Sequence, residues 1–228
     1  MIYNKKEFYG GGIMFIAFFV VLFFMFQPLF SGHNAMEYLD NLYNSISKGS
    51  INYIPQLKEE AGAYDAKQIT VEMTYASEAE AAQSESLFMA AGAQAAVSGA
   101  TLKVTGSLGG ILKAGLADSA YMYANDGAAV SAKYSLDARR SLYNWWTSLK
   151  LMDRSLKSQK EFEAAKVVNT VQTKAVEAAY NYFGVEPVQI MDEVGMVAFS
   201  LIFYVLYTLW YGFSILFLFE GWGLKLSH

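Results

Sequence analysis

Cysteine is absent from this chain, and histidine is almost absent. The lack of cysteine excludes disulfides, thiolate metal sites, haem attachment through cysteine and cysteine nucleophiles. The two histidines, His33 and His228, are too few for a histidine-rich metal centre within one chain. A basic surface is lacking as well, because the formal net charge is −4, and nucleic acid is therefore not an expected partner.

Motifs that carry chemistry are also lacking. The sequence contains no nucleophile motif, no P-loop and no dinucleotide fingerprint. Gly10–Gly12 precedes an apolar run rather than a βα turn, and we expect it only to ease entry into a bilayer. Two groups are more typical of solvated helix faces than of a metal site: His33 with Glu37, and Glu78 with Glu80 and Glu85. We therefore predict no catalytic, cofactor-binding or metal-binding residue, and we expect that the protein is not an enzyme.

Two long runs contain no charged residue, and they dominate the sequence. Val194–Phe219 would reach about 39 Å as a helix, which exceeds the ~30 Å hydrocarbon core of a bilayer. Phe8–Phe30 is the second run, and it could also be a secretory signal peptide. Its apolar core is longer than that of a signal peptide, and no small-x-small cleavage site follows it. We therefore predict two transmembrane helices, with no ionisable acid or base inside either.

The basic residues that flank these runs predict the orientation. Lys5 and Lys6 precede the first run, whereas 175–193, before the second run, contains no Lys or Arg. Basic residues near the ends of a span favour the cytoplasmic side. We expect both termini in the cytoplasm and the central domain outside it, in a plasma or inner membrane. The predicted segments are a tail at 1–7, a helix at 8–30, an α+β domain at 31–126, an amphipathic helical segment at 127–193, a helix at 194–219 and a tail at 220–228.

Strict alternation of apolar and polar residues marks a strand at Ile69–Tyr75. Ser77 is a candidate N-cap for a helix that extends to about Ala91. Two short alternating runs joined by Ser98–Thr101 predict a hairpin, and a helix should follow from about Leu108 to Asn125. The order strand, helix, strand, strand, helix is most of a split βαβ, or ferredoxin-like, layer. The fold class expected is thus a membrane protein with two helices flanking an α+β domain.

An all-α helical bundle is the alternative. Gly92, Gly99 and Gly106 are seven residues apart in an alanine-rich segment, which suits one long helix packed through a seam of small residues. Three glycines would cost such a helix about 2–3 kcal/mol relative to alanine.

Helical periodicity begins near Ala128 and continues to Gly184. Apolar residues recur at spacings of three and four on both sides of a slip near Gln159-Lys160. The pattern predicts one long amphipathic helix, or two helices end to end. Trp145 falls in the apolar stripe and should lie in the core.

Candidate interaction residues lie on this helix and on the second apolar run. Arg139, Arg140, Trp146 and Arg154 are candidate interaction residues, because aromatic and arginine side chains are favoured at interface hot spots. Helical spacing predicts that Arg139, Trp146 and Arg154 share one outward surface. The excess of basic residues in 127–174 is expected to lie across the acidic part of the same chain or of a neighbour; contact with anionic lipid headgroups is the alternative. Tyr204, Tyr207 and Tyr211 should face another membrane helix.

The leading hypothesis for function is a non-catalytic, membrane-anchored accessory or scaffold subunit. It would dock partner proteins through its extracytoplasmic domain. The expected partners are membrane lipids and other membrane or extracytoplasmic proteins, with self-association as a further possibility. The alternative is a ligand-sensing membrane protein that signals through partner subunits, although both tails are too short to hold an output domain.

Overall fold

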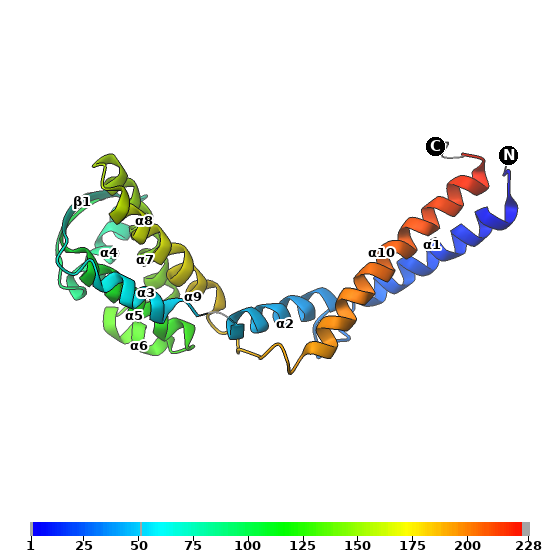
Figure 1. Cartoon of the computed structure of the whole chain (residues 1–228), viewed down its shortest axis with the longest axis horizontal. Helices are drawn as coiled ribbons and strands as arrows, with labels where there is room; N and C mark the ends of the chain where they lie inside the picture. Colours follow the sequence, from blue (N-terminus) through cyan, green and yellow to red (C-terminus); the bar gives the residue numbers. More distant parts are fainter. Residues whose placement is uncertain (1, 51, 225–228) are drawn as a thin grey trace. The chain divides into compact units, whose positions relative to one another are not determined.

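A computed structural model of the chain describes residues 2–50 and 52–224. The chain folds as two compact units, and both are visible in Figure 1. One unit combines residues 1–50 with 186–228, and the other comprises 51–185. The sequence predicts that 31–50 and 186–193 belong to the central domain, whereas both segments fall in the unit that contains the two apolar helices.

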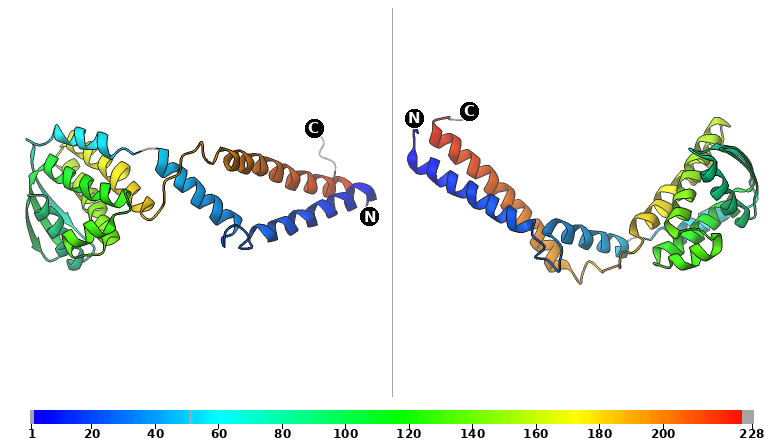
Figure 2. Two further views of the ribbon diagram at one scale, coloured as in Figure 1. Left: turned by 90° about the horizontal axis from the view of Figure 1, so that it is seen from below. Right: turned by 180° about the vertical axis from the view of Figure 1, so that it is seen from behind.

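The unit 51–185 contains a three-stranded sheet, which Figure 2 shows from two sides. Its strands are β1 (Gln68–Thr74), β2 (Gln94–Ser98) and β3 (Thr101–Ser107), and β3 pairs antiparallel with both others. The order β1-β3-β2 is that of a split βαβ unit, as the sequence predicts. Every second residue of β1 is buried, which confirms that one face of this strand packs against the core.

Three helices accompany the sheet in sequence: α3 (Ile54–Gly62), α4 (Glu78–Ala90) and α5 (Leu108–Tyr123). Ser77 caps α4, since its hydroxyl accepts from the Glu80 N–H at 3.2 Å. The all-α alternative is wrong. Gly92 has a φ of +80° after α4, and Gly99 has a φ of +59° in the hairpin turn, so each glycine breaks the helical path rather than lining a seam.

The helical region that follows is divided into more pieces than the periodicity suggests. It contains α6 (Gly127–Tyr134), α7 (Ala138–Ser158), α8 (Phe162–Val171), a π-helical turn η1 (Gln172–Val176) and α9 (Glu177–Tyr182). The run from α8 through η1 to α9 is continuous and packs beside α7. Neither one long helix nor two helices end to end is therefore correct.

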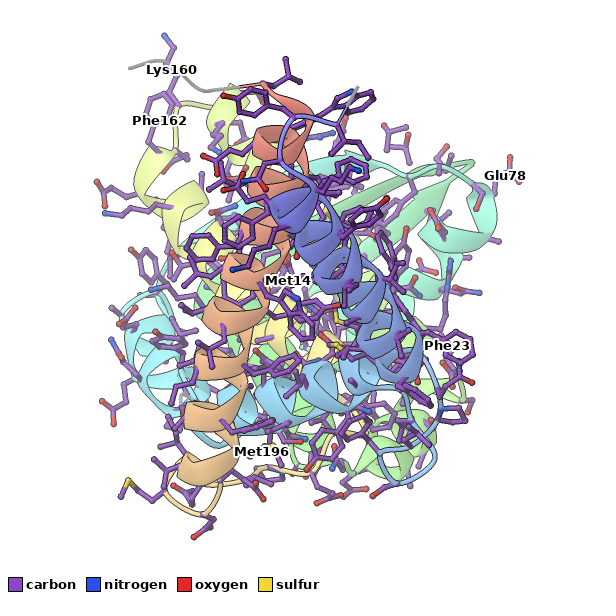
Figure 3. All side chains as sticks on the ribbon, turned by 90° about the vertical axis from the view of Figure 1, so that its right-hand side faces the viewer. Met14, Phe23, Glu78, Lys160, Phe162 and Met196 are labelled. Atoms are coloured by element: carbon purple, nitrogen blue, oxygen red, sulfur yellow. The ribbon has the colours of Figure 1, made fainter. Side chains whose placement is uncertain are left out.

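The reversal between α7 and α8 occurs at Lys160. Its φ is +64°, and the Glu161 N–H donates to the Leu156 carbonyl at 2.9 Å, which is a Schellman termination. Lys160 and Phe162 lie at the tip of this hairpin (Figure 3). Glycine usually occupies such a left-handed position, so the residue type at 160 does not indicate the turn, although the periodicity slips there.

The core of 51–185 lies between the sheet and the helices α4, α5, α7 and α8. Trp145 of α7 is fully buried, as predicted, and its ring meets that of Phe88 at a centroid distance of 5.5 Å. The largest buried aliphatic residues around them come from α4, β3, α5 and α7: Leu87, Leu102, Leu108, Ile111, Leu112, Leu116, Leu142 and Leu149. The opposite face of the sheet carries exposed polar side chains.

The other unit contains α1 (Lys5–Met25), α2 (Ala35–Ser50) and α10 (Val194–Trp222). Helix α2 begins with a capping box, in which Asn34 and Glu37 each accept the backbone N–H of the other, at 2.9 and 3.3 Å. Helix α1 starts inside the predicted polar tail, because Asn4 caps it, and ends five residues before Phe30.

Helices α1 and α10 pack antiparallel to each other, as the views in Figures 1 and 2 agree. Met14 lies on the side of α1 next to α10, whereas Phe23 lies on its outer side (Figure 3). Both helices are long and apolar enough to cross a membrane, and only 6% of the apolar window of each is buried. The core helix of a soluble protein would be mostly buried, so burial within the fold does not account for their composition.

Glycine allows the two backbones to approach closely. A Cβ at Gly11 would lie 2.7 Å from the Leu218 nitrogen and 2.9 Å from the Ser214 oxygen. At Gly221 a Cβ would clash with the backbone nitrogen of Phe8. The expectation that Gly10–Gly12 only eases entry into a bilayer is incomplete, because Gly11 is part of a helix–helix contact.

We predict that Gly11→Val weakens the pairing of α1 with α10 by about 1–3 kcal/mol, the usual cost of overpacking. Gly10→Val is the matched control, because no atom lies within 4 Å of a Cβ at that position. Thermal unfolding of the full chain in mild detergent measures both variants. Equal destabilisation would mean that the close approach at Gly11 does not hold the hairpin together.

Candidate interaction surfaces

The predicted interaction residues of α7 contact three different parts of the domain. Arg139 contacts the end of α9: its Nη2 donates to the Phe183 carbonyl at 3.1 Å, and its guanidinium lies over the Tyr180 and Phe183 rings. Arg139 therefore holds α7 against the segment that follows α9.

Arg140 points towards α4. Its Nε donates to Gln83 at 2.8 Å and its Nη2 to Glu80 at 3.2 Å, while the guanidinium lies over the Tyr143 ring. The expectation that basic residues of this region lie across the acidic part of their own chain is met at this position. The pair is partly exposed and contributes little more than a surface ion pair would.

Trp146 is half-buried and joins α7 to α9. Its Nε1 donates to the Glu177 carboxylate at 2.9 Å, the Tyr143 ring stacks on it at 6.2 Å, and the Lys150 ammonium lies 4.6 Å from its ring centroid. A pocket of about 300 Å³ opens beside the indole, lined by Tyr143, Trp146, Glu177, Tyr180 and Asn181. Trp146 thus combines contacts within the fold with exposed aromatic area, and we name this site the aromatic pocket.

Arg154 lies elsewhere. It lines a groove of about 570 Å³ between the last turns of α7 and the strands β1 and β3. The groove is lined by Thr70, Glu72, Met73, Thr74, Lys103, Leu151, Arg154, Ser155, Ser158 and Gln159. The structure therefore does not gather Arg139, Arg140, Trp146 and Arg154 on one surface.

Sequence reasoning missed a buried polar cluster around Asp118 of α5. This fully buried carboxylate accepts hydrogen bonds from Tyr134 Oη, from Trp145 Nε1 at 2.8 Å and from Lys133 Nζ at 2.8 Å. Burial and the adjacent Asp118 raise the pKa of the Tyr134 phenol. The cluster joins α5, α6 and α7, and its role is structural, since each carboxylate oxygen is already hydrogen-bonded within the fold.

Within residues 2–50 and 52–224, no group of three or more His, Asp or Glu side chains could hold a metal ion. His33 Nδ1 lies 3.6 Å from Glu37 Oε2, and both side chains are more than half exposed. This pair is a solvated contact at the start of α2.

Two of the three tyrosines predicted to face another helix contact α1. Tyr207 stacks on Phe18 at 4.2 Å and donates to the Phe18 carbonyl at 3.1 Å, and Tyr211 lies 5.0 Å from the Phe18 ring. Tyr204 has no ring contact or side-chain hydrogen bond with α1 within 2–50 and 52–224, and 69% of it is exposed. Trp210 also contacts α1, since its Nε1 donates to the Met14 carbonyl at 3.1 Å, although the spacing of the tyrosines does not indicate it.

An apolar cavity of about 280 Å³ lies where α1, α2 and α10 meet. Phe24, Leu39 and Phe199 contribute to its wall, one from each helix. Ser200 also lines it and is hydrogen-bonded to the Tyr43 hydroxyl at 2.7 Å, which joins α2 to α10.

The Asp118 cluster predicts a loss of stability in alkaline solution. An unfolded tyrosine ionises near pH 10, whereas folded Tyr134 has a raised pKa and keeps its proton. The free energy of unfolding that this raised pKa contributes is thus fully present below pH ~10 and is lost as the pH rises further. Tyr134→Phe should cost about 1–3 kcal/mol at pH ~8, because Asp118 loses a donor, and should flatten the fall above pH ~10.

Denaturant unfolding of the full chain in detergent, at a series of pH values, measures both effects. Tyr121→Phe is the control, because Tyr121 is 48% exposed and its removal should not change the slope. An unchanged slope in Tyr134→Phe would show that the phenol ionises as readily in the folded state as in the unfolded state.

Comparison of the chain with protein-family models, with curated proteins and with solved structures finds no match, so the geometry above is the basis for a functional proposal.

Proposed function

We propose that this chain is an integral membrane protein, anchored by α1 and α10, whose domain at 51–185 docks partner proteins without catalysing a reaction. The length of the helices supports the membrane anchor, since 29 residues of α10 reach about 43 Å, more than a ~30 Å hydrocarbon core. Their packing supports it too, because the aromatic and apolar side chains around α1 and α10 are largely exposed rather than buried.

The aromatic pocket is the observation that carries the docking proposal. Tyr143, Trp146 and Tyr180 present rigid rings around a cavity, with the carboxylate of Glu177 and the amide of Asn181 at its border. Aromatic side chains fixed before binding lose little conformational entropy on association, and tryptophan and tyrosine are enriched at interface hot spots. Arg140 and Glu177 hold Tyr143 and Trp146 in position.

The proposed orientation has both termini in the cytoplasm and 51–185 outside it. It follows from Lys5 and Lys6 beside α1, and from the lack of Lys and Arg between 175 and 193. With this orientation, the aromatic pocket would meet extracytoplasmic proteins or the extracytoplasmic parts of membrane proteins.

Tyr204 supports a second contact, inside the membrane. It lies near the middle of the apolar part of α10 and is 69% exposed, with no hydrogen bond to its hydroxyl among the described residues. A hydroxyl in hydrocarbon is unfavourable without a partner. A helix of another membrane protein, or of a second copy, would supply an acceptor.

Filling the aromatic pocket tests the docking proposal. We expect Asn181→Trp to reduce co-purification of a stoichiometric partner in mild detergent by at least about 30-fold, which corresponds to the ~2 kcal/mol of a hot spot. Asn181 is exposed, so the variant should unfold within about 0.5 kcal/mol of the wild type. Thr173→Trp is the matched control, because Thr173 is exposed on the same helical run and does not line the pocket. Retention of the partner by Asn181→Trp would refute docking at this site.

Reporter fusions test the orientation. A reporter that is active only in the cytoplasm should work at both termini, and one that is active only after export should work when inserted at the exposed tip near Lys160. Activity of the exported reporter at either terminus would reverse the proposed topology.

A further inference from the structure

Strand β1 is at an edge of the sheet, and its pairing shows which backbone groups are open. The Lys67 carbonyl accepts from the Leu108 N–H, and the Tyr75 N–H donates to the Ala100 carbonyl, each at 2.9 Å. Alternate residues of an antiparallel pair exchange hydrogen bonds, so the odd-numbered residues of β1 face β3. Thr70, Glu72 and Thr74 therefore direct their N–H and C=O groups to the free edge.

The Thr70 carbonyl, which is one of these open groups, already accepts a hydrogen bond from an amide that resembles a peptide N–H. The side-chain amide of Gln159, at the end of α7, donates to the Thr70 carbonyl at 3.0 Å. In 52–224, no hydrogen bond is made by the backbone groups of Glu72 or by the Thr74 N–H. The edge is thus capped at one end and open over the next residues, where an added strand could pair with it.

Helix α7 forms the second wall of this edge, and the space between them is the groove of about 570 Å³ described above. Two cations line it, Arg154 from α7 and Lys103 from β3, and neither has an ion pair or hydrogen bond within the described part of the chain. Glu72 is the one acidic residue in the lining. The groove therefore combines open backbone groups with an excess of positive charge.

We propose that the groove between β1 and α7 binds an extended acidic segment of a partner protein, which adds to the sheet as a strand beside β1. The partner's backbone pairs with Glu72 and Thr74, and its Asp or Glu side chains reach Arg154 and Lys103. This inference rests on the proposed docking function and names the chemistry of a partner at a second site on the same domain.

The charge of the chain's own strands argues against a second copy as the occupant. The other free edge is that of β2, Gln94–Ser98, which carries no charged residue and so does not complement Arg154 and Lys103. The edge of β1 offers a single acid, Glu72, which the same two cations already neighbour.

A peptide titration against the full chain in detergent micelles tests the proposal. The probe is a fluorescent eight-residue peptide of alternating Val and Asp, compared with a Val and Lys peptide and with a Val and Asp peptide N-methylated at alternate residues. N-methylation removes the N–H donors of one edge and keeps the charge. We expect the unmodified acidic peptide to bind at least about tenfold more tightly than either of the others.

Variants of the chain separate the contribution of backbone hydrogen bonding to binding from that of charge. Glu72→Pro removes an N–H that points to the open edge and should weaken binding at least about tenfold, while the pairing of β1 with β3 is kept. Ala95→Pro is the matched control, because the register places the Ala95 N–H on the open edge of β2. Arg154→Glu should weaken binding to a similar extent, and Lys166→Glu makes the same change of charge at an exposed position outside the groove.

Several outcomes would overturn the inference. If the N-methylated peptide bound as tightly as the unmodified acidic peptide, charge alone would attract the probe. If Arg154→Glu and Lys166→Glu weakened binding equally, the net charge of the chain, rather than the groove, would attract it. If Glu72→Pro changed the oligomeric state in the absence of peptide, the edge of β1 would bind a second copy of the chain instead. If no peptide binds while a partner still depends on Asn181, the strand site is wrong and the proposed docking function stands.

Discussion

The hydrogen bonds to the carboxylate of Asp118 are the interaction on which the rest of the domain depends. A carboxylate removed from water costs several kcal/mol unless donors replace its hydration. Here the donors are an indole, a phenol and an ammonium, and they come from α6 and α7. The same carboxylate thereby fixes the rotation of α7 about its axis, because Trp145 must present Nε1 to it. That rotation decides that Trp146, the next residue, reaches α9 and borders the aromatic pocket.

The sheet could be predicted because each strand carries its own signal. Ile69, Val71 and Met73 alternate with polar residues, and Ser77 and Ser107 each precede a helix that they cap. Burial of one strand face enforces a period of two, and capping needs a hydroxyl at one position, so both features can be read locally. The turn at Lys160 coincides with the slip in the periodicity, but the residue type gives no signal of its own. The left-handed conformation of Lys160 is stabilised by the hydrogen bonds to the Leu156 and Lys157 carbonyls rather than by the preference of lysine.

The candidate site was harder to predict than the fold, because helical periodicity gives the direction of a side chain but not its neighbour. Arg139 and Arg154 were expected on one surface of α7, yet α9 lies beside one and strand β1 beside the other. The burial and hydrogen bonding of Asp118 could not be predicted for the same reason, since its donors are 15 to 27 residues away in sequence. In the hairpin of α1 and α10, the tyrosine spacing did identify the side of α10 that meets α1 at Tyr207 and Tyr211, but Tyr204 lies away from it.

The side-chain hydrogen bonds between α1 and α10 run in one direction, from α10 to α1, and this has a consequence for biosynthesis. From Gly10 to Met25, no side chain of α1 carries an N–H or O–H group, whereas α10 supplies both donors, Tyr207 and Trp210, to backbone carbonyls of α1. The ribosome makes α1 before α10, so α1 lacks its partner helix until the whole of 51–185 has been synthesised. In the membrane-spanning role proposed above, α1 would have no unsatisfied donor during this time, since its own backbone bonds are internal. Helix α10 brings the polar groups last, when their acceptors are already in place. The chain therefore has an order of assembly built into it, and exchanging the two helices would leave the donors unpaired for the entire synthesis of the domain.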